Sequence, residues 1–352
     1  MLLYIHIPFC DSKCFYCAFN SYTSLHSLRE DYMKALSVQL KNELEQYDKK
    51  VETIFIGGGT PSTIEAKEYK KLLALVHPYL IEKCEITIEA NPNSANKEWL
   101  EDISKIGINR ISFGVQSFDD EKLNFLGRNH SSKEAIEAIN NAKNAGFENI
   151  NCDIIYDTQL DTKKLLENDI NIIKKLPINH ISAYSLTLEK GTKFFNKKNV
   201  QLEDEKLARW LFDEFNVLGF EQYEISNFAL NDKARSKHNL GYWQYKEYLG
   251  VGSGAVGCLE NKRYYSQKDV KKYILNPLEY EDIETLSKDD VLIEKVLLGF
   301  RSVVGIDMNL FDKKVQEKLV ILNDSEKVKI ENKRVYAKDF MLADELSLYL
   351  DI

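Results

Sequence analysis

The sequence contains no long apolar run. None of its hydrophobic stretches reaches the roughly 18 residues that a membrane-spanning helix needs. The first segment, Met1–Ile7, is largely apolar, but Pro8, Phe9 and Cys10 follow at once, with no basic leader and no small-residue cleavage site. This is not the pattern of a signal peptide. We therefore expect a cytoplasmic protein, whose contact with any membrane would be peripheral.

The sequence also lacks an excess of positive charge. Its 47 Lys and Arg residues are outnumbered by 55 Asp and Glu residues, which gives a formal net charge of −8. A surface that binds nucleic acid is normally basic, so nucleic acid is not expected as a main partner. A heme or a nucleotide is not excluded, because a local site binds it. With 44% hydrophobic and 29% charged residues, the composition is that of an ordinary globular protein.

Cysteine is scarce, with six residues in 352. In the cytoplasm thiols stay reduced, so these cysteines indicate metal binding more than disulfides. Three of them, Cys10, Cys14 and Cys17, lie within eight residues. The other three are scattered singly: Cys84, Cys152 and Cys258.

Strand-like and helix-like segments alternate through the first two thirds of the chain. The expected strands are Leu2–His6, Val51–Ile56, Glu85–Glu89, Arg110–Val115, Asn149–Tyr156 and His180–Leu188. The expected helices between them are Leu28–Tyr47, Glu65–His77, Lys97–Ile106, Ser132–Ala145 and Thr162–Leu176. This alternation predicts an α/β fold of parallel βαβ units. Six units are too few to close an eight-stranded barrel, so we expect an open partial barrel or a doubly wound sheet, with sites at the carboxyl ends of the strands.

The alternation fades after about residue 199, which suggests three parts. Residues 1–230 form the expected core and residues 231–281 a connecting segment with a glycine-rich loop at 250–254. Residues 282–352 form a small α+β unit, with helices at Lys288–Val303 and Met341–Leu350 and a hairpin between them. Arg301 lies in this unit, which we expect to serve as a lid or a docking surface.

The motif Cys10-x-x-x-Cys14-x-x-Cys17 places three thiolates on one short loop after the first strand. Thiolates are the ligands of iron–sulfur clusters. A four-iron cubane held by three cysteines keeps one iron open for another ligand. Two alternatives remain at this point: a structural zinc site, with His6 or His26 as the fourth ligand, and reduced cysteines without a metal.

The sequence Cys-x-x-x-Cys-aromatic-x-Cys resembles the radical S-adenosylmethionine (SAM) superfamily. The segment from Tyr4 to Cys10, Tyr-Ile-His-Ile-Pro-Phe-Cys, is similar to the family of HemN coproporphyrinogen III oxidases and HemW heme chaperones. The resemblance extends through the whole chain. It implies a partial (β/α)6 barrel with a small winged-helix-like unit, and a [4Fe–4S] cluster whose open iron binds SAM, so zinc is no longer expected.

The resemblance also implies the SAM contacts. Gly57-Gly58-Gly59-Thr60-Pro61 follows the second strand and is similar to the segment that binds the amino group of SAM. Glu89 would hold ribose hydroxyls or an ammonium group, and Arg128 would pair with the SAM carboxylate. Taken singly, each such residue is more often a surface or capping residue. The full expected set is Tyr4, Tyr16, Gly58, Gly59, Thr60, Glu89, Gln116, Arg128, Asp153 and Val256.

Two segments depart from the family pattern. Asp157-Thr158-Gln159 stands where the family has Gly-Leu-Pro. Val256-Gly257 stands where the family has His-Ser after Gly-Ala. Both departures concern the expected pocket and neither touches the cluster ligands.

Three features favour the chaperone branch over the oxidase branch. Phe19 occupies the position of a fourth cysteine of the oxidases, and the long extension that precedes their first strand has no counterpart before Met1. His-Asn-x-x-Tyr-Trp matches the motif of HemW-like proteins and implies a heme site at His238, Asn239, Tyr242 and Trp243. From the residues alone, a packed core cluster is the alternative, and His130 and Cys258 are weaker ligand candidates.

We therefore expect a heme chaperone that carries the cluster and exchangeable SAM and delivers heme to acceptor proteins, respiratory or membrane-bound acceptors included. The alternative is an oxygen-independent coproporphyrinogen III oxidase, and a radical SAM enzyme with another substrate, such as a methyltransferase, is a third hypothesis. Whether the chain is an enzyme and whether it forms a homodimer stay open.

Overall fold

The computed structural model describes residues 1–352, and a single open sheet of 12 strands dominates it. Its central part consists of six parallel strands in chain order, which confirms the predicted βαβ units. These strands are β1 (Leu2–Ile7), β2 (Val51–Gly58), β3 (Leu80–Ala90), β4 (Arg110–Gln116), β5 (Asn149–Tyr156) and β6 (His180–Ser185).

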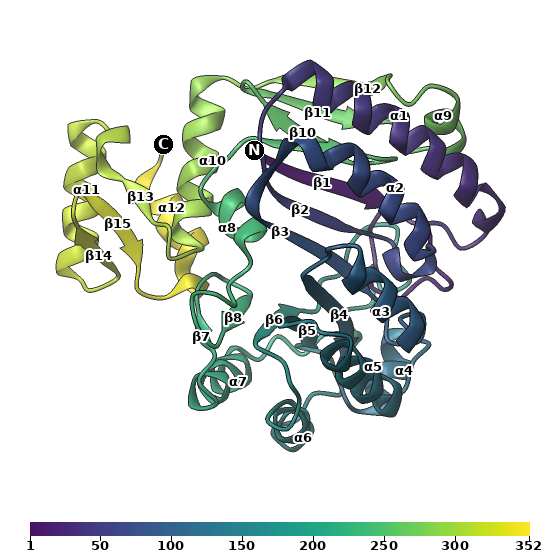
Figure 1. Cartoon of the computed structure of the whole chain (residues 1–352). Helices are drawn as coiled ribbons and strands as arrows, with labels where there is room; N and C mark the ends of the chain where they lie inside the picture. The colour runs from purple at the N-terminus through teal and green to yellow at the C-terminus, as the bar shows by residue number, and fades with distance from the viewer.

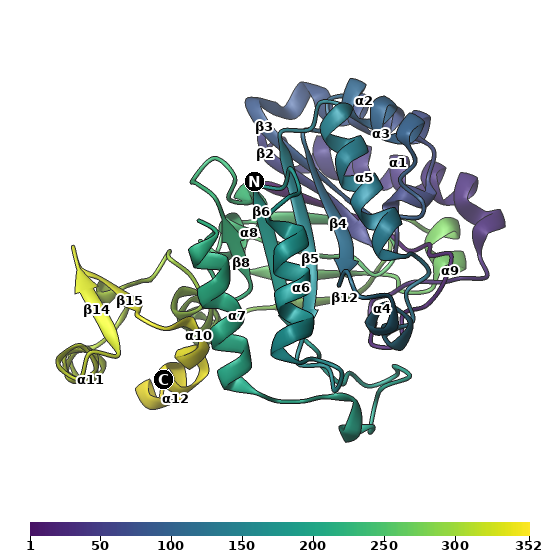
Figure 2. The same ribbon diagram turned by 90° about the horizontal axis from the view of Figure 1, so that it is seen from below.

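Helices follow the central strands and cover one face of the sheet (Figures 1 and 2). They are α1 (Arg29–Tyr47), α2 (Ala66–Val76), α3 (Lys97–Lys105), α4 (Asp120–Leu126), α5 (Ser132–Asn144), α6 (Lys163–Ile173) and α7 (Glu205–Val217). Most of their starts have a side-chain cap: a capping box of Ser131 and Glu134 begins α5, for example. A core of 57 buried apolar residues includes Leu36 of α1, Leu72 of α2 and Ile54 of β2. The opposite face of the sheet is therefore left to form the site.

The segment expected to be a connection extends the sheet instead. Strand β9 (Tyr248–Val251) pairs in parallel with β1, and β10 (Val256–Leu259), β11 (Lys262–Ser266) and β12 (Tyr280–Thr285) continue from it in antiparallel order. β12 crosses the expected boundary at 281/282. Two short strands, β8 (Asn227–Ala229) and β7 (Glu221–Gln222), follow β6 at the other edge. The sheet ends at β12 and β7, so the barrel stays open.

Two short helices complete this part of the chain. Helix α8 (Lys237–Trp243) packs against β2, and α9 (Val270–Leu275) packs against α1. The Ser236 hydroxyl accepts a hydrogen bond from the Asn239 N–H and so caps α8 at its start. Helix α8 carries the His-Asn-x-x-Tyr-Trp motif, so the packing of α8 on β2 brings this motif to the sheet.

The last part of the chain is a small α+β unit that stands beside the sheet in both views (Figures 1 and 2). It contains α10 (Lys288–Phe300), β13 (Ile306–Asp307), α11 (Lys313–Asp324), β14 (Val328–Glu331), β15 (Arg334–Ala337) and α12 (Ala343–Leu350). Its three strands form an antiparallel sheet over a separate core of 13 buried residues, as expected for a winged-helix-like unit. None of the helices of the chain is both long enough and apolar enough to span a membrane.

Candidate cofactor-binding cavities

The three cysteines of the motif line one cavity of about 690 Å³ on the polar face of the sheet. Cys10 is buried, and Cys14 and Cys17 are half-buried. Removal from water raises the pKa of Cys10 and of Cys17. The Thr60 hydroxyl donates a hydrogen bond to the Cys10 sulfur at 3.3 Å. Arg128 donates through Nη1 to the Cys14 sulfur at 3.2 Å. Donors and a cation beside the sulfurs favour thiolates, which are the form that binds iron.

A zinc site does not fit the same residues. Both ring nitrogens of His6 are engaged, Nδ1 with the Tyr4 hydroxyl at 2.9 Å and Nε2 with the Asn20 carbonyl at 2.8 Å. The other candidate, His26, lies 3.9 Å from Asp11. No group of three His, Cys, Asp or Glu side chains is placed to hold a single ion. In a cubane, by contrast, each thiolate binds a different iron.

The glycine segment is packed too tightly for any side chain. A Cβ at Gly58 would lie 2.5 Å from the His6 ring, and one at Gly59 would lie 2.8 Å from the Ile7 carbonyl oxygen. The N–H groups of Gly59 and Thr60 donate to Ile7 and Phe9, and the N–H of Gly58 donates to Glu89. The segment can therefore present only carbonyl oxygens to a ligand, which suits an ammonium group.

Two carboxylates face the cavity, Glu89 from β3 and Asp153 from β5, on either side of β4. Removal from water and the nearby Asp153 together raise the pKa of Glu89 to about 8. The pKa of Asp153 is raised to about 6 by the same loss of solvation, although Asn151 donates a hydrogen bond to it at 2.6 Å. A cationic ligand would favour the ionised form of both groups. The cavity is therefore suited to a positively charged molecule such as SAM.

Arg128 joins the cysteine loop to the end of β4. Its Nη2 donates to the Asn91 side-chain oxygen at 2.7 Å and to the Gly114 carbonyl at 2.6 Å, while its Nε is buried without an acceptor. This free donor can receive a carboxylate of a ligand. Eight of the ten expected SAM residues line this cavity: Tyr16, Gly58, Gly59, Thr60, Glu89, Gln116, Arg128 and Asp153.

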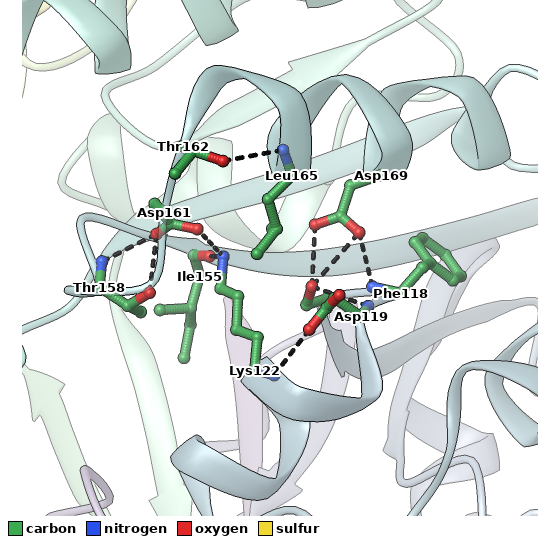
Figure 3. Close-up of polar contacts among 10 residues, drawn as sticks. Phe118, Asp119, Lys122, Ile155, Thr158, Asp161, Thr162, Leu165 and Asp169 are labelled. Atoms are coloured by element: carbon green, nitrogen blue, oxygen red, sulfur yellow. Dashed lines mark hydrogen bonds and ion pairs between the residues drawn. The ribbon is translucent and has the colours of Figure 1, made fainter.

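A buried network supports this wall of the cavity from behind (Figure 3). Lys122 of α4 is fully buried and donates to Asp161 at 2.6 Å and to the Ile155 carbonyl at 2.7 Å. Asp161 in turn accepts from the N–H and the hydroxyl of Thr158. Because α4 leads directly into Arg128, the ion pair of Lys122 and Asp161 fixes the Arg128 turn to the end of β5.

The first departure from the family pattern belongs to this network. Asp157 stands where the family has glycine and adopts the left-handed conformation with φ 64°, which aspartate tolerates better than most residues. Its carboxylate accepts from the Ser185 hydroxyl at 2.7 Å. The N–H and the hydroxyl of Thr158 donate hydrogen bonds to Asp161. The substituted segment therefore keeps the glycine-like backbone and adds side-chain bonds.

A second, larger cavity of about 1330 Å³ adjoins the first. Tyr4 and Val256, both expected at SAM, line this second cavity and not the first, so direct SAM contact from them is not supported. Tyr4 lies three residues before the carboxyl end of β1, and its ring stacks with Phe55 at 6.3 Å. Five residues at the junction line both cavities: Ala18, Phe19, Ser21, Phe55 and Asn239.

His238 lies in the wall of the second cavity and is 1% exposed. Its Nδ1 bonds to the Thr53 hydroxyl at 2.8 Å, whereas Nε2 is buried without any partner. The ring packs between Phe55, at 5.2 Å, and the edge-on Tyr242, at 4.8 Å. Burial lowers the pKa of His238 to about 3. The side chain is thus a neutral imidazole with a free nitrogen.

The other residues of the His-Asn-x-x-Tyr-Trp motif do not all line the second cavity. Asn239 and Tyr242 line the second cavity, but Trp243 lines neither cavity, and its indole N–H is buried without a partner. Direct heme contact from Trp243 is therefore not supported. Cys258 lines the second cavity, whereas His130 donates through Nε2 to the Val115 carbonyl and lines neither.

The sequence analysis missed several residues of the first cavity. Asn91 follows β3 and bonds to Arg128, and Tyr184 is the fifth residue of β6. Thr87 and Arg110 lie one layer deeper. The available signal was strand alternation, since Thr87 precedes Glu89 by two residues and shares its face.

The open parallel sheet and the cavity of three cysteines at its carboxyl edge define a radical SAM protein. In agreement, the family model described as "Radical SAM superfamily" matches residues 4–184. The chain is 35% identical to "Heme chaperone HemW" of Bacillus subtilis, over 88% of this chain and 86% of that protein. It is 36% identical to the protein of the same name in Haemophilus influenzae, over 88% and 85%.

The chain therefore belongs to the radical SAM superfamily and, within it, to the HemW family. Among solved structures it is similar to the HemN coproporphyrinogen III oxidase of Escherichia coli, with a TM-score of 0.83, covering 99% of this chain and 90% of that chain. At 19% identity this likeness establishes the fold. The superfamily implies a [4Fe–4S] cluster and SAM, and the three thiols and the acidic cavity fit them.

Proposed function

We propose that the chain is a heme chaperone. It binds heme in the second cavity, carries a [4Fe–4S] cluster on Cys10, Cys14 and Cys17, and holds exchangeable SAM in the first cavity. The observation that carries the proposal is the unpartnered Nε2 of His238. Histidine is a common ligand of heme iron, and here it is neutral and flanked by aromatic rings. The names of the relatives in two bacteria support the same function.

The side chains prepare this site in a definite way. The Thr53 hydroxyl fixes the orientation of the His238 ring through Nδ1, which leaves Nε2 as the free nitrogen. Because Nε2 is covered in this structure, heme binding requires a side chain that covers it to move aside. The volume of the second cavity, about 1330 Å³, exceeds the roughly 300–1,000 Å³ of sites for drug-sized ligands, so its size suits a ligand as large as heme.

The first cavity would hold the cluster and SAM. The cluster, when bound, supplies an electron to the SAM sulfonium. Thr60 and Arg128 stabilise the thiolates, the glycine segment accepts the ammonium group, and Glu89 and Asp153 balance the positive charge of SAM. The free Nε donor of Arg128 receives the SAM carboxylate.

Delivery is the remaining part of the proposal. Arg301 of the C-terminal unit lines the second cavity and pairs with Asp344 of the same unit. Tyr245 and Arg263 at this cavity also bond to Glu294 of α10. These contacts suit the C-terminal unit as a lid that opens to release heme to an acceptor protein. The acceptors are proposed to include membrane-bound proteins, which a cytoplasmic chaperone would reach peripherally.

A heme titration of the anaerobically reconstituted full chain tests the proposal. The wild-type chain should develop a Soret band that saturates at a one-to-one ratio, and His238→Ala should bind heme at least about tenfold more weakly. The matched control is His130→Ala, a buried histidine that lines neither cavity. Equal affinity in wild type and His238→Ala would remove His238 as the ligand.

The oxidase alternative has its own test. The HemN fold extends over almost the whole chain, so coproporphyrinogen III is the substrate to try. The reconstituted chain is mixed with SAM and coproporphyrinogen III under reducing, anaerobic conditions, and protoporphyrinogen is measured. Phe19 at the position of the fourth oxidase cysteine leads us to expect no turnover. Sustained turnover would contradict the chaperone proposal.

A further inference from the structure

The floor of the cysteine cavity contains a buried arginine without an ion-pair partner. Arg110, the first residue of β4, is 2% exposed and lines the first cavity. Its Nη1 donates to the Ala234 carbonyl at 2.7 Å, but Nη2 is buried without an acceptor. No carboxylate oxygen lies within 4.0 Å of the guanidinium. Arginine is rarely buried unless paired, because an uncompensated charge is costly away from water.

A second unpartnered donor stands beside it. Thr87 of β3 is paired in register with Arg110 of β4 and lines the same cavity. Its hydroxyl is also buried without a partner. A guanidinium and a hydroxyl side by side match the two oxygens of a carboxylate in number and polarity. Neither group is used in the cluster or SAM contacts described above.

The two carboxylates on the strand of Thr87 that flank it on the same face are engaged elsewhere. Glu85, on the same strand as Thr87, accepts from the His238 backbone N–H at 3.0 Å. Glu89 is two residues along β3 from Thr87, about 7 Å nearer the cysteine end, and accepts from the Gly58 N–H. The raised pKa of Glu89, about 8, keeps it mainly protonated at neutral pH. In the chain without SAM, Glu89 therefore does not repel an anion at the floor.

We propose that Arg110 and Thr87 form a carboxylate-binding subsite at the floor of the cysteine cavity, and that its ligand is an ionised propionate of the bound tetrapyrrole. The identity of this ligand rests on the proposed function, whereas the subsite itself does not. Phe55 and Asn239 line both cavities, so the two spaces adjoin at the wall that holds His238. A side arm of a ligand beside His238 can thus extend toward Arg110.

The subsite is tested first without heme. Thermal unfolding of the full chain is measured in increasing sodium propionate and in sodium chloride of equal ionic strength. Propionate should stabilise the wild type, since a ligand that binds only the folded state raises stability. Arg110→Gln should lose this shift, and Thr87→Val should reduce it. The matched control is Arg235→Gln, which removes one positive charge near α8 without lining either cavity.

The ligand-free variants separate binding from a structural role. If Arg110 serves to bind an anion, Arg110→Gln removes an unpaired buried charge, and the ligand-free chain should unfold at no lower temperature than the wild type. A large drop in the unfolding temperature, with the propionate shift retained in Arg110→Lys and Arg110→Gln alike, would overturn the subsite.

The second arm identifies the carboxylate. Heme and heme dimethyl ester are titrated into the wild type and Arg110→Gln. The wild type should prefer the free acid by about tenfold or more, the range of a hydrogen bond between charged groups, and Arg110→Gln should lose that preference. A propionate shift without heme binding would support the subsite and contradict the proposed function. Heme binding through His238 with no propionate shift and no acid preference would overturn the subsite alone.

Discussion

The two cavities share a wall but differ in chemistry. The first is lined by cysteines, carboxylates, arginines and bare glycine backbone of the parallel strands, whereas the second combines aromatic rings from β1, β2, α8 and β9 with charged side chains from β11 and α10. Burial has opposite consequences in them. It keeps Glu89 protonated until a cation arrives, and it keeps His238 unprotonated with a free nitrogen. One cavity is suited to a charged cofactor, and the other to a large apolar ligand that a neutral imidazole can bind.

The largest effect is expected from removing the cluster, which tests whether the two cavities bind their ligands independently. Cys14→Ser should abolish cluster assembly, because each thiolate holds one iron. Iron and sulfide content and visible absorption measure this loss. Heme affinity should stay within about twofold of wild type, as for sites with separate contacts. Cys84→Ser, which changes a cysteine that lines neither cavity, is the control. If Cys14→Ser also lost heme binding, the two sites would not be independent.

The next effect tests the rigid support of the first cavity. Lys122→Met leaves Asp161 buried and unpaired, which should lower the free energy of unfolding by about 3–5 kcal/mol. Urea unfolding measures the change. The double variant Lys122→Met/Asp161→Asn should lose less than the single variant, since it removes the uncompensated charge. Lys105→Met, at an exposed pair, should change stability by less than about 0.5 kcal/mol. A loss below about 1 kcal/mol in Lys122→Met would contradict this role.

The third prediction concerns pH and Glu89. A SAM cation favours ionised Glu89, so SAM binding should release a proton below pH 8. SAM affinity should therefore rise with pH up to about 8, by at most about tenfold per pH unit. Calorimetry in buffers of different ionisation enthalpy measures the proton release. Glu89→Gln should flatten the dependence. An unchanged pH profile in that variant would assign the proton to another group.

The same pKa shift affects the ligand-free chain. The pKa of Glu89 is about 8 in the folded chain, above its ordinary value near 4.5. Its contribution to stability is therefore fully present below pH 4.5 and is lost as pH rises through 8. Relative to Glu89→Gln, the wild type should lose stability between pH 7 and pH 9, and thermal unfolding at the two pH values measures this.

The smallest effect is expected at Phe19, where the two cavities adjoin. Phe19 lines both cavities but is 68% exposed. Phe19→Ala should therefore change the free energy of unfolding by no more than about 0.5 kcal/mol, while SAM and heme affinity both fall slightly. Urea unfolding and the two titrations measure these changes. A large effect on one ligand alone would show that Phe19 belongs to a single cavity.

The regular part of the fold could be predicted because each central strand is a short apolar run followed by an amphipathic helix. The added strands could not, since β12 is almost entirely exposed, β11 has a single buried residue, and both owe their position to pairing with the sheet. Helix α4 has only seven residues and its Lys122 is buried. Neither a helix of seven residues nor a buried lysine gives a periodic hydrophobic pattern that would distinguish this segment from a loop.

The site shows the same division. Spacing predicted the cysteine loop and the strand end predicted Glu89, whereas Asp153, which lies within β5, was expected from the family resemblance. Tyr4 was expected at SAM but lies in the other cavity, since its distance from the carboxyl end of β1 decides which layer it enters. Arg110 and Thr87 were missed because the sequence does not show that their side chains are buried without partners. That arrangement exists only in the folded sheet.

A single titration tests the central claim, that heme binds at His238 in a cavity separate from the cluster. Heme is added to anaerobically reconstituted wild type and His238→Ala, and iron–sulfur content is measured in the same samples. We predict one heme per chain in the wild type, and in His238→Ala an affinity at least about tenfold lower with the cluster intact. Equal heme affinity in the two proteins, or loss of the cluster from His238→Ala, would contradict the claim.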